Sequence, residues 1–246
     1  MPKNKKLPNK ILPIECSDKS FQEKWYEGRN ILNFPWSFAW CLCGPPSSGK
    51  STILKNHIIR AEPPYTKVLV CHYDAEGTNE YDDIGAEMID ELPDPKKINP
   101  IKEKMMLIIE DLNLTTLSKE EKYKLDRLAG YSRSHRGVSL GLTVQNPLDC
   151  PVGFRRMCNV FTLWRQPDLN GLMLMARRTG YKQKDFIEFF KFCKRQHDSI
   201  TIDCTDMTPA PLRFNGYQLI KEKNEEEIDD TPTPENETLT YDSNKK

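Results

Sequence analysis

Residues 38–52 read FAWCLCGPPSSGKST, an apolar run followed by a turn rich in glycine, proline and serine. The second half matches G-x-x-x-x-G-K-[ST], the pattern of a loop that holds the phosphates of a nucleotide. Its glycines let the backbone turn tightly, and N–H groups at the start of the following helix point at the anion. The motif follows an expected strand at 37–43 and opens an expected helix at 50–60, which is the context that this chemistry needs.

The motif predicts how individual residues of the loop contact the nucleotide. Lys50 is expected to neutralise the β- and γ-phosphates, and Ser51 to hold Mg²⁺ through its hydroxyl. Since proline has no N–H, the phosphate cradle has to be built from residues 47–52. The sequence predicts ATP as the ligand but does not exclude GTP, because such a loop reads phosphates and not the base. The predicted ATP-binding residues are Gly44, Pro45, Pro46, Ser47, Ser48, Gly49, Lys50, Ser51 and Thr52.

Two acids, Glu110 and Asp111, end the apolar run that begins at Met105. Buried carboxylates are costly, so acids at the end of such a run favour a functional role over a packing role. We expect Glu110 to hold the metal together with Ser51, and Asp111 to be the base that orients the attacking water. Neighbouring strand residues point to opposite faces, so the two roles could be exchanged.

Further candidates follow the next apolar run at 138–144. Gln145 ends this run, and in a parallel sheet all carboxyl ends share the edge where ligands bind. Gln145 is therefore expected to reach the γ-phosphate or the water. Arg155 and Arg156 precede the run at 159–164, and one of them is expected to act as an arginine finger at the site of a neighbouring subunit. The sequence does not separate these two arginines.

Short apolar runs alternate with helical patterns through most of the chain, which predicts an α/β fold with a mainly parallel central sheet flanked by helices. One such domain is predicted at 21–220. Residues 1–20 are expected to form a loose basic arm, and 221–246 a disordered acidic tail. From Lys221 onward nine acids stand against four lysines, which leaves 1–220 with a net charge of +5. The expected strands lie at 37–43, 67–72, 105–110, 138–145, 159–164 and 200–204, with a hairpin or edge strand at 212–219, and the expected helices lie at 50–60, 118–133 and 182–197.

The eight cysteines form no Cys-x-x-Cys pair. They are expected to be buried, reduced thiols rather than disulfides or zinc ligands, which favours a reducing compartment. No signal peptide is visible, and no apolar run approaches the ~20 residues of a membrane span, so no membrane partner is expected.

These motifs together resemble the FtsK/HerA superfamily of DNA-pumping ATPases over residues 35–165, in the family's order. The stretch SRSHRGVS at 132–139, followed by Gln145, is similar to the Arg-His-x-x-x-Ser…Gln stretch of its viral branch. That branch contains the genome-packaging ATPases of poxviruses, other large DNA viruses and virophages. The resemblance implies a P-loop NTPase fold of the RecA/FtsK-HerA type, a Mg–ATP site at Lys50 and Ser51, and a sensor role for Gln145. Arg155 or Arg156 would then be the finger acting in trans.

One departure concerns the acid pair. The family usually has Asp followed by Glu, or two Asp, whereas this chain has Glu110 followed by Asp111. The resemblance therefore leaves the division of labour between the two acids open, and it leaves the ATP site unaffected.

The resemblance implies a motor that hydrolyses ATP to move double-stranded DNA into a preformed capsid. Such a motor would be a ring of five or six copies of the chain, with capsid protein as a further partner. Its expected location is the virus factory in the host cytoplasm, or the virion. The candidate DNA contacts are Arg177, Arg178, Lys182 and Lys184. Arg133 and Arg136 are expected near the active edge, where they could couple neighbouring subunits.

Two other functions fit the same motifs. A P-loop nucleoside or nucleotide kinase needs an arginine-rich lid, which Arg177 and Arg178 could form, but the acid pair and Gln145 suit attack by water better. A nucleotide-dependent capsid scaffold would bind ATP and recruit capsid protein through the acidic tail. The scaffold predicts that neutralising both acids leaves function intact.

Overall fold

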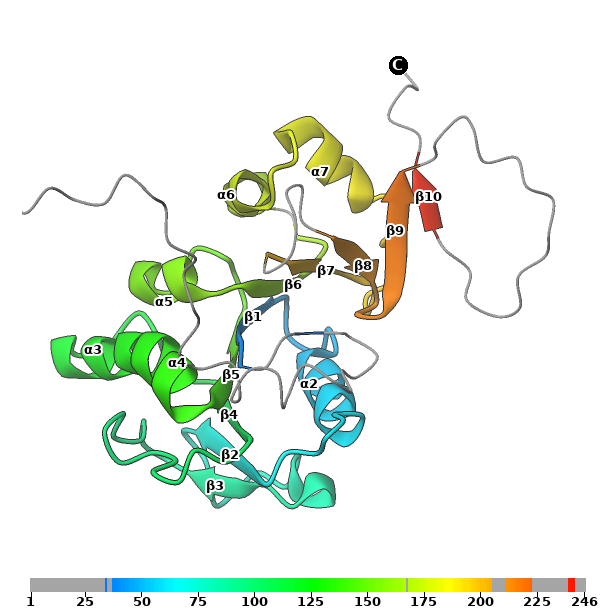
Figure 1. Ribbon diagram of the computed structural model, residues 1–246. Helices are drawn as coiled ribbons and strands as arrows, with labels where there is room; N and C mark the ends of the chain where they lie inside the picture. Colours follow the sequence, from blue (N-terminus) through cyan, green and yellow to red (C-terminus); the bar gives the residue numbers. More distant parts are fainter. Residues whose placement is uncertain (1–33, 35–36, 167, 205–210, 223–238, 242–246) are drawn as a thin grey trace, which may run out of the picture.

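The computed structural model describes residues 34, 37–166, 168–204, 211–222 and 239–241. Within these residues the strands form one sheet, in the order β10-β9-β8-β7-β6-β1-β5-β4-β2-β3 (Figure 1). The strands from β6 to β3 in this order are mutually parallel. They are β1 (Ala39–Cys43), β2 (Lys67–His72), β3 (Glu87–Ile89), β4 (Met105–Glu110), β5 (Val138–Val144) and β6 (Val160–Trp164). The prediction of an α/β fold with a mainly parallel sheet is confirmed.

An antiparallel extension lies beside β6. It consists of β7 (Ser199–Asp203), β8 (Leu212–Phe214) and β9 (Gln218–Glu222), and β10 (Leu239–Tyr241) pairs parallel to β9. A turn at Asn215 and Gly216, both with positive φ, joins β8 to β9. This pair of residues suits such a hairpin turn, because both can adopt the left-handed conformation. The predicted hairpin at 212–219 is therefore present.

The sequence predicted a disordered tail from residue 221, whereas residues 221–222 lie in β9 and 239–241 form β10. The rest of that tail and the whole predicted arm at 1–20 lie outside the described residues, so these two predictions remain as they were.

Helices cover both faces of the sheet (Figure 1). Residues of β1 alternate between them: Trp40 and Leu42 join an apolar cluster that includes Leu54 and Ile58 of α2, and Cys41 joins the cluster of the opposite face. This alternation follows from the two-residue period of a strand. The face opposite α2 carries the helical segments from α3 to α7. The helical segments are α2 (Lys50–Ile59), η1 (Asp82–Ile84), α3 (Lys119–Arg127), the π-helix η2 (Leu128–Ser132), α4 (Arg133–Arg136), α5 (Val152–Met157), α6 (Leu169–Thr179) and α7 (Gln183–Phe189).

The packing of α2 on the sheet fixes where the phosphate loop lies. Leu54 of α2 is fully buried, and a Cβ placed on Gly141 of β5 would come within 2.7 Å of its Cδ2 atom. The absence of a side chain at Gly141 thus leaves the space that Leu54 fills. This contact holds the amino end of α2 against the centre of the sheet.

Replacing Leu54 with alanine should lower the free energy of unfolding by about 2–5 kcal/mol, because the substitution leaves a cavity over Gly141. Urea unfolding followed by circular dichroism measures this loss. Ile59→Ala is the matched control, since Ile59 is on the same helix but is 66% exposed, and it should change stability by less than about 0.5 kcal/mol. Equal effects of the two variants would contradict the packing described.

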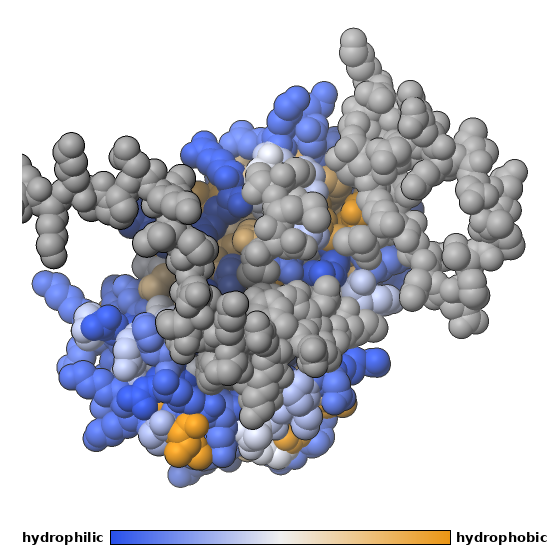
Figure 2. Space-filling model, viewed as in Figure 1, coloured by the Kyte–Doolittle hydropathy of each residue, from blue (hydrophilic) through white to orange (hydrophobic). Residues whose placement is uncertain are grey.

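Six of the cysteines, Cys41, Cys43, Cys71, Cys150, Cys158 and Cys193, are buried free thiols, and Cys204 is a half-buried one. Cys16 lies outside the described residues. Every helix in the described ranges is too short or too polar to traverse a bilayer. Figure 2 shows that the described part of one face is mostly hydrophilic, with small, separate hydrophobic areas.

Candidate nucleotide-binding site

Three strand ends are tied together at the carboxyl edge of the parallel sheet. The N–H of Gly44, directly after β1, donates to the carbonyl of Val144 at the end of β5 at 3.1 Å. The side-chain amide of Gln166, just beyond β6, donates to the carbonyl of Gln145 and to Sγ of Cys43, both at 3.1 Å. Gln166 is buried. It fixes the start of the phosphate loop relative to Gln145, and no sequence motif pointed to it.

The phosphate loop contains two residues with positive φ. Ser47 has φ 58°, and Gly49, the N-cap of α2, has φ 98°. A Cβ on Gly44 would lie 2.8 Å from the buried Trp164 ring, so the loop approaches this ring more closely than any side chain would allow. Nζ of Lys50 donates to the carbonyls of Gly44 and Pro45 at 2.9 Å. The lysine side chain therefore lies across the mouth of its own loop. Burial lowers the pKa of Lys50.

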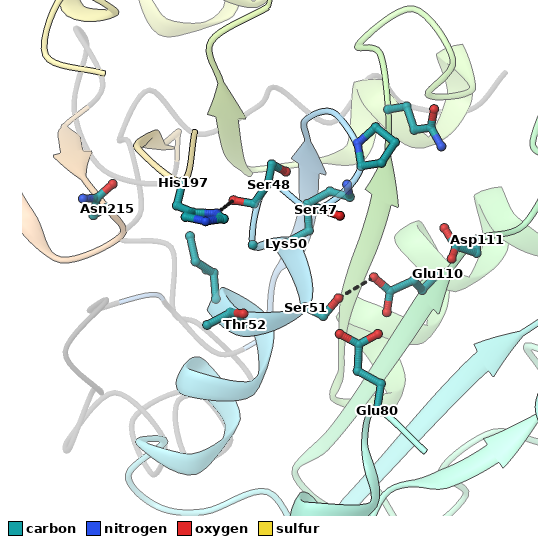
Figure 3. A pocket seen from close by; sticks show the side chains of 14 residues that line it. Ser47, Ser48, Lys50, Ser51, Thr52, Glu80, Glu110, Asp111, His197 and Asn215 are labelled. Carbon is teal, nitrogen blue, oxygen red and sulfur yellow. Dashed lines mark hydrogen bonds between the residues drawn. The ribbon is translucent and has the colours of Figure 1, made fainter. Parts of the chain in front are cut away.

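Ser51 and Glu110 meet at this edge. The Ser51 hydroxyl donates to Oε1 of Glu110 at 2.9 Å (Figure 3), and the hydroxyl of Tyr81 donates to Oε2. Glu110 is only 5% exposed. Burial raises its pKa, an effect that these two hydrogen bonds oppose. The predicted metal pair thus lies in direct contact, and Tyr81 is an additional partner that the sequence did not reveal.

The second acid lies in a different environment from the first. Asp111 directly follows β4 with φ 53°, and its side chain is 60% exposed. Nε2 of His72, at the end of β2, lies 3.5 Å from its Oδ2 atom. Nδ1 of His72 accepts from the N–H of Asp74 at 3.1 Å, so Nε2 is the nitrogen that carries the proton facing Asp111. Glu80 also points toward Ser51 and Glu110 (Figure 3).

A cavity of about 660 Å³ runs along the loop and brings Lys50, Glu110, Asp111 and Gln145 together. Candidates from α2 and from the ends of β4 and β5 thus line one space, and a ligand pocket of this size is ordinary for a small molecule. A second cavity of about 440 Å³ shares Lys50, Asp111 and Gln145 with the first. The roles assigned to these residues stay predictions.

The far side of the larger cavity is lined by His197 and Asn215 (Figure 3), which the sequence analysis did not single out. Nδ1 of His197 lies 3.3 Å from the Ser48 carbonyl oxygen, and the side-chain amide of Gln196 donates to the carbonyl of Ser47 at 3.3 Å. Because β7 is antiparallel to β6, its amino end brings these residues to the edge where the parallel strands end.

The residues at this edge fit Mg²⁺ and a nucleotide. A serine hydroxyl beside a buried carboxylate supplies the oxygen ligands that Mg²⁺ prefers. Oγ of Ser48 is buried with no hydrogen-bond partner within the described residues. The first N–H groups of α2 have no acceptor within the helix and face the loop.

No protein-family model and no curated protein matches this sequence. Among solved structures, the chain is similar to B204, the DNA-packaging ATPase from Sulfolobus turreted icosahedral virus. The TM-score is 0.53 at 16% identity, over 72% of this chain and 96% of that one. The chain has the fold of a P-loop NTPase. A second similar structure is the genome packaging NTPase B204 of Sulfolobus turreted icosahedral virus 2 in complex with AMPPCP. The TM-score is 0.50 at 16% identity, over 72% of this chain and 96% of that one. The predicted resemblance to viral packaging ATPases is thus confirmed at the level of the fold.

The two candidate finger residues lie on α5, and neither lines the cavity of its own chain. The Arg155 guanidinium donates to the carbonyls of Pro147 and Cys150, at 3.0 and 3.4 Å. Arg156 is exposed, and its guanidinium makes no hydrogen bond or ion pair within the described residues. Within the described residues, Arg156 is therefore less constrained than Arg155.

Arg178, one of the candidate DNA contacts, already has partners within the chain. Its guanidinium donates to three backbone carbonyls after and within α5, those of Arg155, Arg156 and Cys158, at 2.7–3.1 Å. It joins the end of α6 to α5, and this use argues against Arg178 as a DNA contact. The other candidates, Arg177, Lys182 and Lys184, are exposed.

The expectation that Arg133 and Arg136 lie near the active edge is wrong. Both are in α4, which leads into β5 and therefore lies at the amino edge of the sheet, opposite the phosphate loop. Arg133 donates to the carbonyl of Met157, and Arg136 to that of Lys96, both at 3.0 Å. These bonds attach α4 to neighbouring segments.

Proposed function

We propose that this chain is a Mg²⁺-dependent ATPase that drives double-stranded DNA into a preformed viral capsid. The observation that carries the ATPase part is the 2.9 Å hydrogen bond from Ser51 to Glu110 beside Lys50, at an edge that also presents Asp111 and Gln145. A phosphate loop, a metal pair and polar groups for a water molecule are the parts that phosphoryl transfer to water requires. The fold similarity to B204 supports the packaging part.

Each residue at the edge has a task in this proposal. Lys50 leaves the carbonyls of Gly44 and Pro45 and binds the terminal phosphates. Ser51 and Glu110 hold the metal, which when bound supplies positive charge to the phosphate oxygens. Asp111 accepts the proton of the attacking water, because its exposed carboxylate lines both cavities. Gln145 orients that water or senses the terminal phosphate.

The same proposal includes the partners. The chain works as a ring of five or six copies, in which Arg156 of one copy approaches the cavity of the next. Arg177, Lys182 and Lys184 contact DNA phosphates, since the body of the chain is basic. Capsid protein is the remaining partner, and the motor acts in the host cytoplasm or at the virion.

Duplex DNA is expected to stimulate ATP hydrolysis by the purified chain, and the stimulation should fall with rising salt, because contacts to phosphates release counterions. A steady-state ATPase assay with and without duplex DNA, repeated at several salt concentrations, measures both effects. The variant Lys182→Ala with Lys184→Ala should lose much of the stimulation. The control is Lys119→Ala with Lys122→Ala, a pair of exposed lysines on α3. Transfer of the terminal phosphate to a nucleoside, or an ATPase rate that duplex DNA does not change, would contradict the proposal of a DNA-translocating motor.

A further inference from the structure

Both carboxylate oxygens of Glu110 already have a hydroxyl donor. Oε1 accepts from Ser51 at 2.9 Å, and Oε2 accepts from Tyr81. Tyr81 is 1% exposed and Glu110 is 5% exposed, so both hydrogen bonds are largely shielded from water. The carboxylate is therefore held between one hydroxyl from the phosphate loop and one from outside it.

Tyr81 is held by contacts that do not depend on Glu110. Its ring belongs to the apolar cluster on the α2 face of the sheet, together with Val70 and Ile108. Nζ of Lys55 on α2 lies 2.8 Å from the Asp83 carboxylate and donates to the carbonyl of Glu80 at 2.8 Å. The segment is thus fastened to α2 on both sides of Tyr81. A hydroxyl carried on so rigid a support can fix the orientation of a flexible partner.

We infer that Tyr81 is a positioning residue for the metal-side carboxylate: its hydroxyl occupies Oε2 of Glu110, so that Oε1 remains directed at Ser51 and at a metal held there. The inference rests on the proposed function, since it assumes that Ser51 and Glu110 hold Mg²⁺. A glutamate has three rotatable side-chain torsions, and outer partners that orient a ligating carboxylate commonly affect metal affinity. Tyr81 does not touch the nucleotide in this scheme.

The alternative is that the hydrogen bond from Tyr81 to Glu110 is purely structural and contributes only to the stability of the fold. The two readings differ in one observable. A structural hydroxyl changes the stability of the fold and leaves the Mg²⁺ requirement of nucleotide binding unchanged. A positioning hydroxyl changes that requirement and leaves the binding of nucleotide without metal unchanged.

The variant Tyr81→Phe distinguishes a positioning role of the hydroxyl from a structural one. In the full chain, binding of a fluorescent ATP analogue is titrated with Mg²⁺, and the variant should need about tenfold more Mg²⁺ for half-maximal tightening, because a hydrogen bond to a charged group is lost. Affinity without Mg²⁺ should stay within about twofold of the wild type. Tyr65→Phe is the matched control. The hydroxyl of Tyr65 also forms a hydrogen bond to a buried side chain, 2.9 Å from Nε2 of His57, and this pair is far from Glu110. Thermal unfolding of each variant reports the fold separately.

Two further variants keep the test decisive. In a Glu110→Gln background, Tyr81→Phe should add nothing to the Mg²⁺ response, because the carboxylate that it positions is absent. Lys55→Met is the substitute test in case Tyr81→Phe does not fold. It removes the ion pair to Asp83 and the hydrogen bond to the Glu80 carbonyl without touching the site, and it should also raise the Mg²⁺ requirement. A wild-type Mg²⁺ requirement in a folded Tyr81→Phe variant would overturn the inference. Absence of any Mg²⁺ effect in the wild type would instead overturn the proposed ATPase site itself.

Discussion

Replacing Lys50 with alanine is expected to reduce ATP turnover by about 10²–10³-fold, because the variant loses the one cation that lies within the phosphate loop. Nζ of Lys50 bonds to the carbonyls of Gly44 and Pro45 inside the loop, from which it is expected to move onto a bound phosphate. Nucleotide affinity should fall as well. Release of inorganic phosphate from ATP, measured with Mg²⁺ in excess, gives the turnover.

The control for this variant is Lys67→Ala. Lys67 is an exposed lysine at the start of β2, where it pairs with Glu87 at 2.7 Å. Its loss should leave turnover within about twofold of the wild type, as expected for a surface ion pair. If Lys50→Ala retained wild-type hydrolysis, the phosphate loop would not be the site of the reaction.

The second large effect concerns the acid pair, and here the two single variants should behave differently. Asp111→Asn is expected to lower the turnover number by about 10²–10⁴-fold with little change in Mg–ATP affinity, since it removes a general base and not a metal ligand. Glu110→Gln should weaken Mg²⁺-dependent nucleotide binding and also stop hydrolysis. This assignment follows from the structure, in which Glu110 is buried on Ser51 and Asp111 is exposed at the cavity.

Measuring nucleotide affinity with and without Mg²⁺, alongside single-turnover hydrolysis, separates the two roles. If Mg²⁺ no longer strengthened nucleotide binding in Asp111→Asn but still did so in Glu110→Gln, Asp111 would be the metal ligand and Glu110 the base. The sequence alone had left this exchanged assignment open. If both variants hydrolysed ATP normally, the site would have no catalytic acid.

The sequence predicted five of the six parallel strands, because these five are largely buried and read as continuous apolar runs; β3 is short and partly exposed, and it was not predicted. The run at 105–110 is β4, and that at 138–145 is β5 with Gln145 directly after it. The rule that parallel strands end at one edge then placed the phosphate loop, the acids and Gln145 around one cavity. The same rule should have placed Arg133 and Arg136 at the opposite edge, because they precede a strand.

The helices were predicted less completely. The expected helix at 182–197 ends at Phe189, because the chain then continues in turns that keep Phe190 and Cys193 buried. An apolar stripe at 3.6-residue spacing does not reveal where such a helix stops. The α6 helix was visible in the sequence, since Leu172, Met175, Ala176 and Thr179 recur on one face, but it was not predicted. With only six residues, α5 is too short for a period to be recognised.

The parts of the site that the sequence did not predict depend on tertiary packing. Tyr81 lies in a segment between β2 and β3 that carries no motif, and its contact with Glu110 bridges 29 positions of the chain. His197 and Asn215 reach the cavity only because β7 and β8 add to the sheet in the antiparallel sense. No local pattern determines on which edge such added strands present their ends.

A structure of the chain with Mg²⁺ and a non-hydrolysable ATP analogue tests the central claim most directly. The account predicts the phosphates on the backbone of residues 47–52, with Nζ of Lys50 on the terminal phosphates. It also predicts the metal between Ser51 and Glu110, with Asp111 and Gln145 facing the terminal phosphate. A nucleotide bound elsewhere, or a metal that touches neither Ser51 nor Glu110, would contradict it.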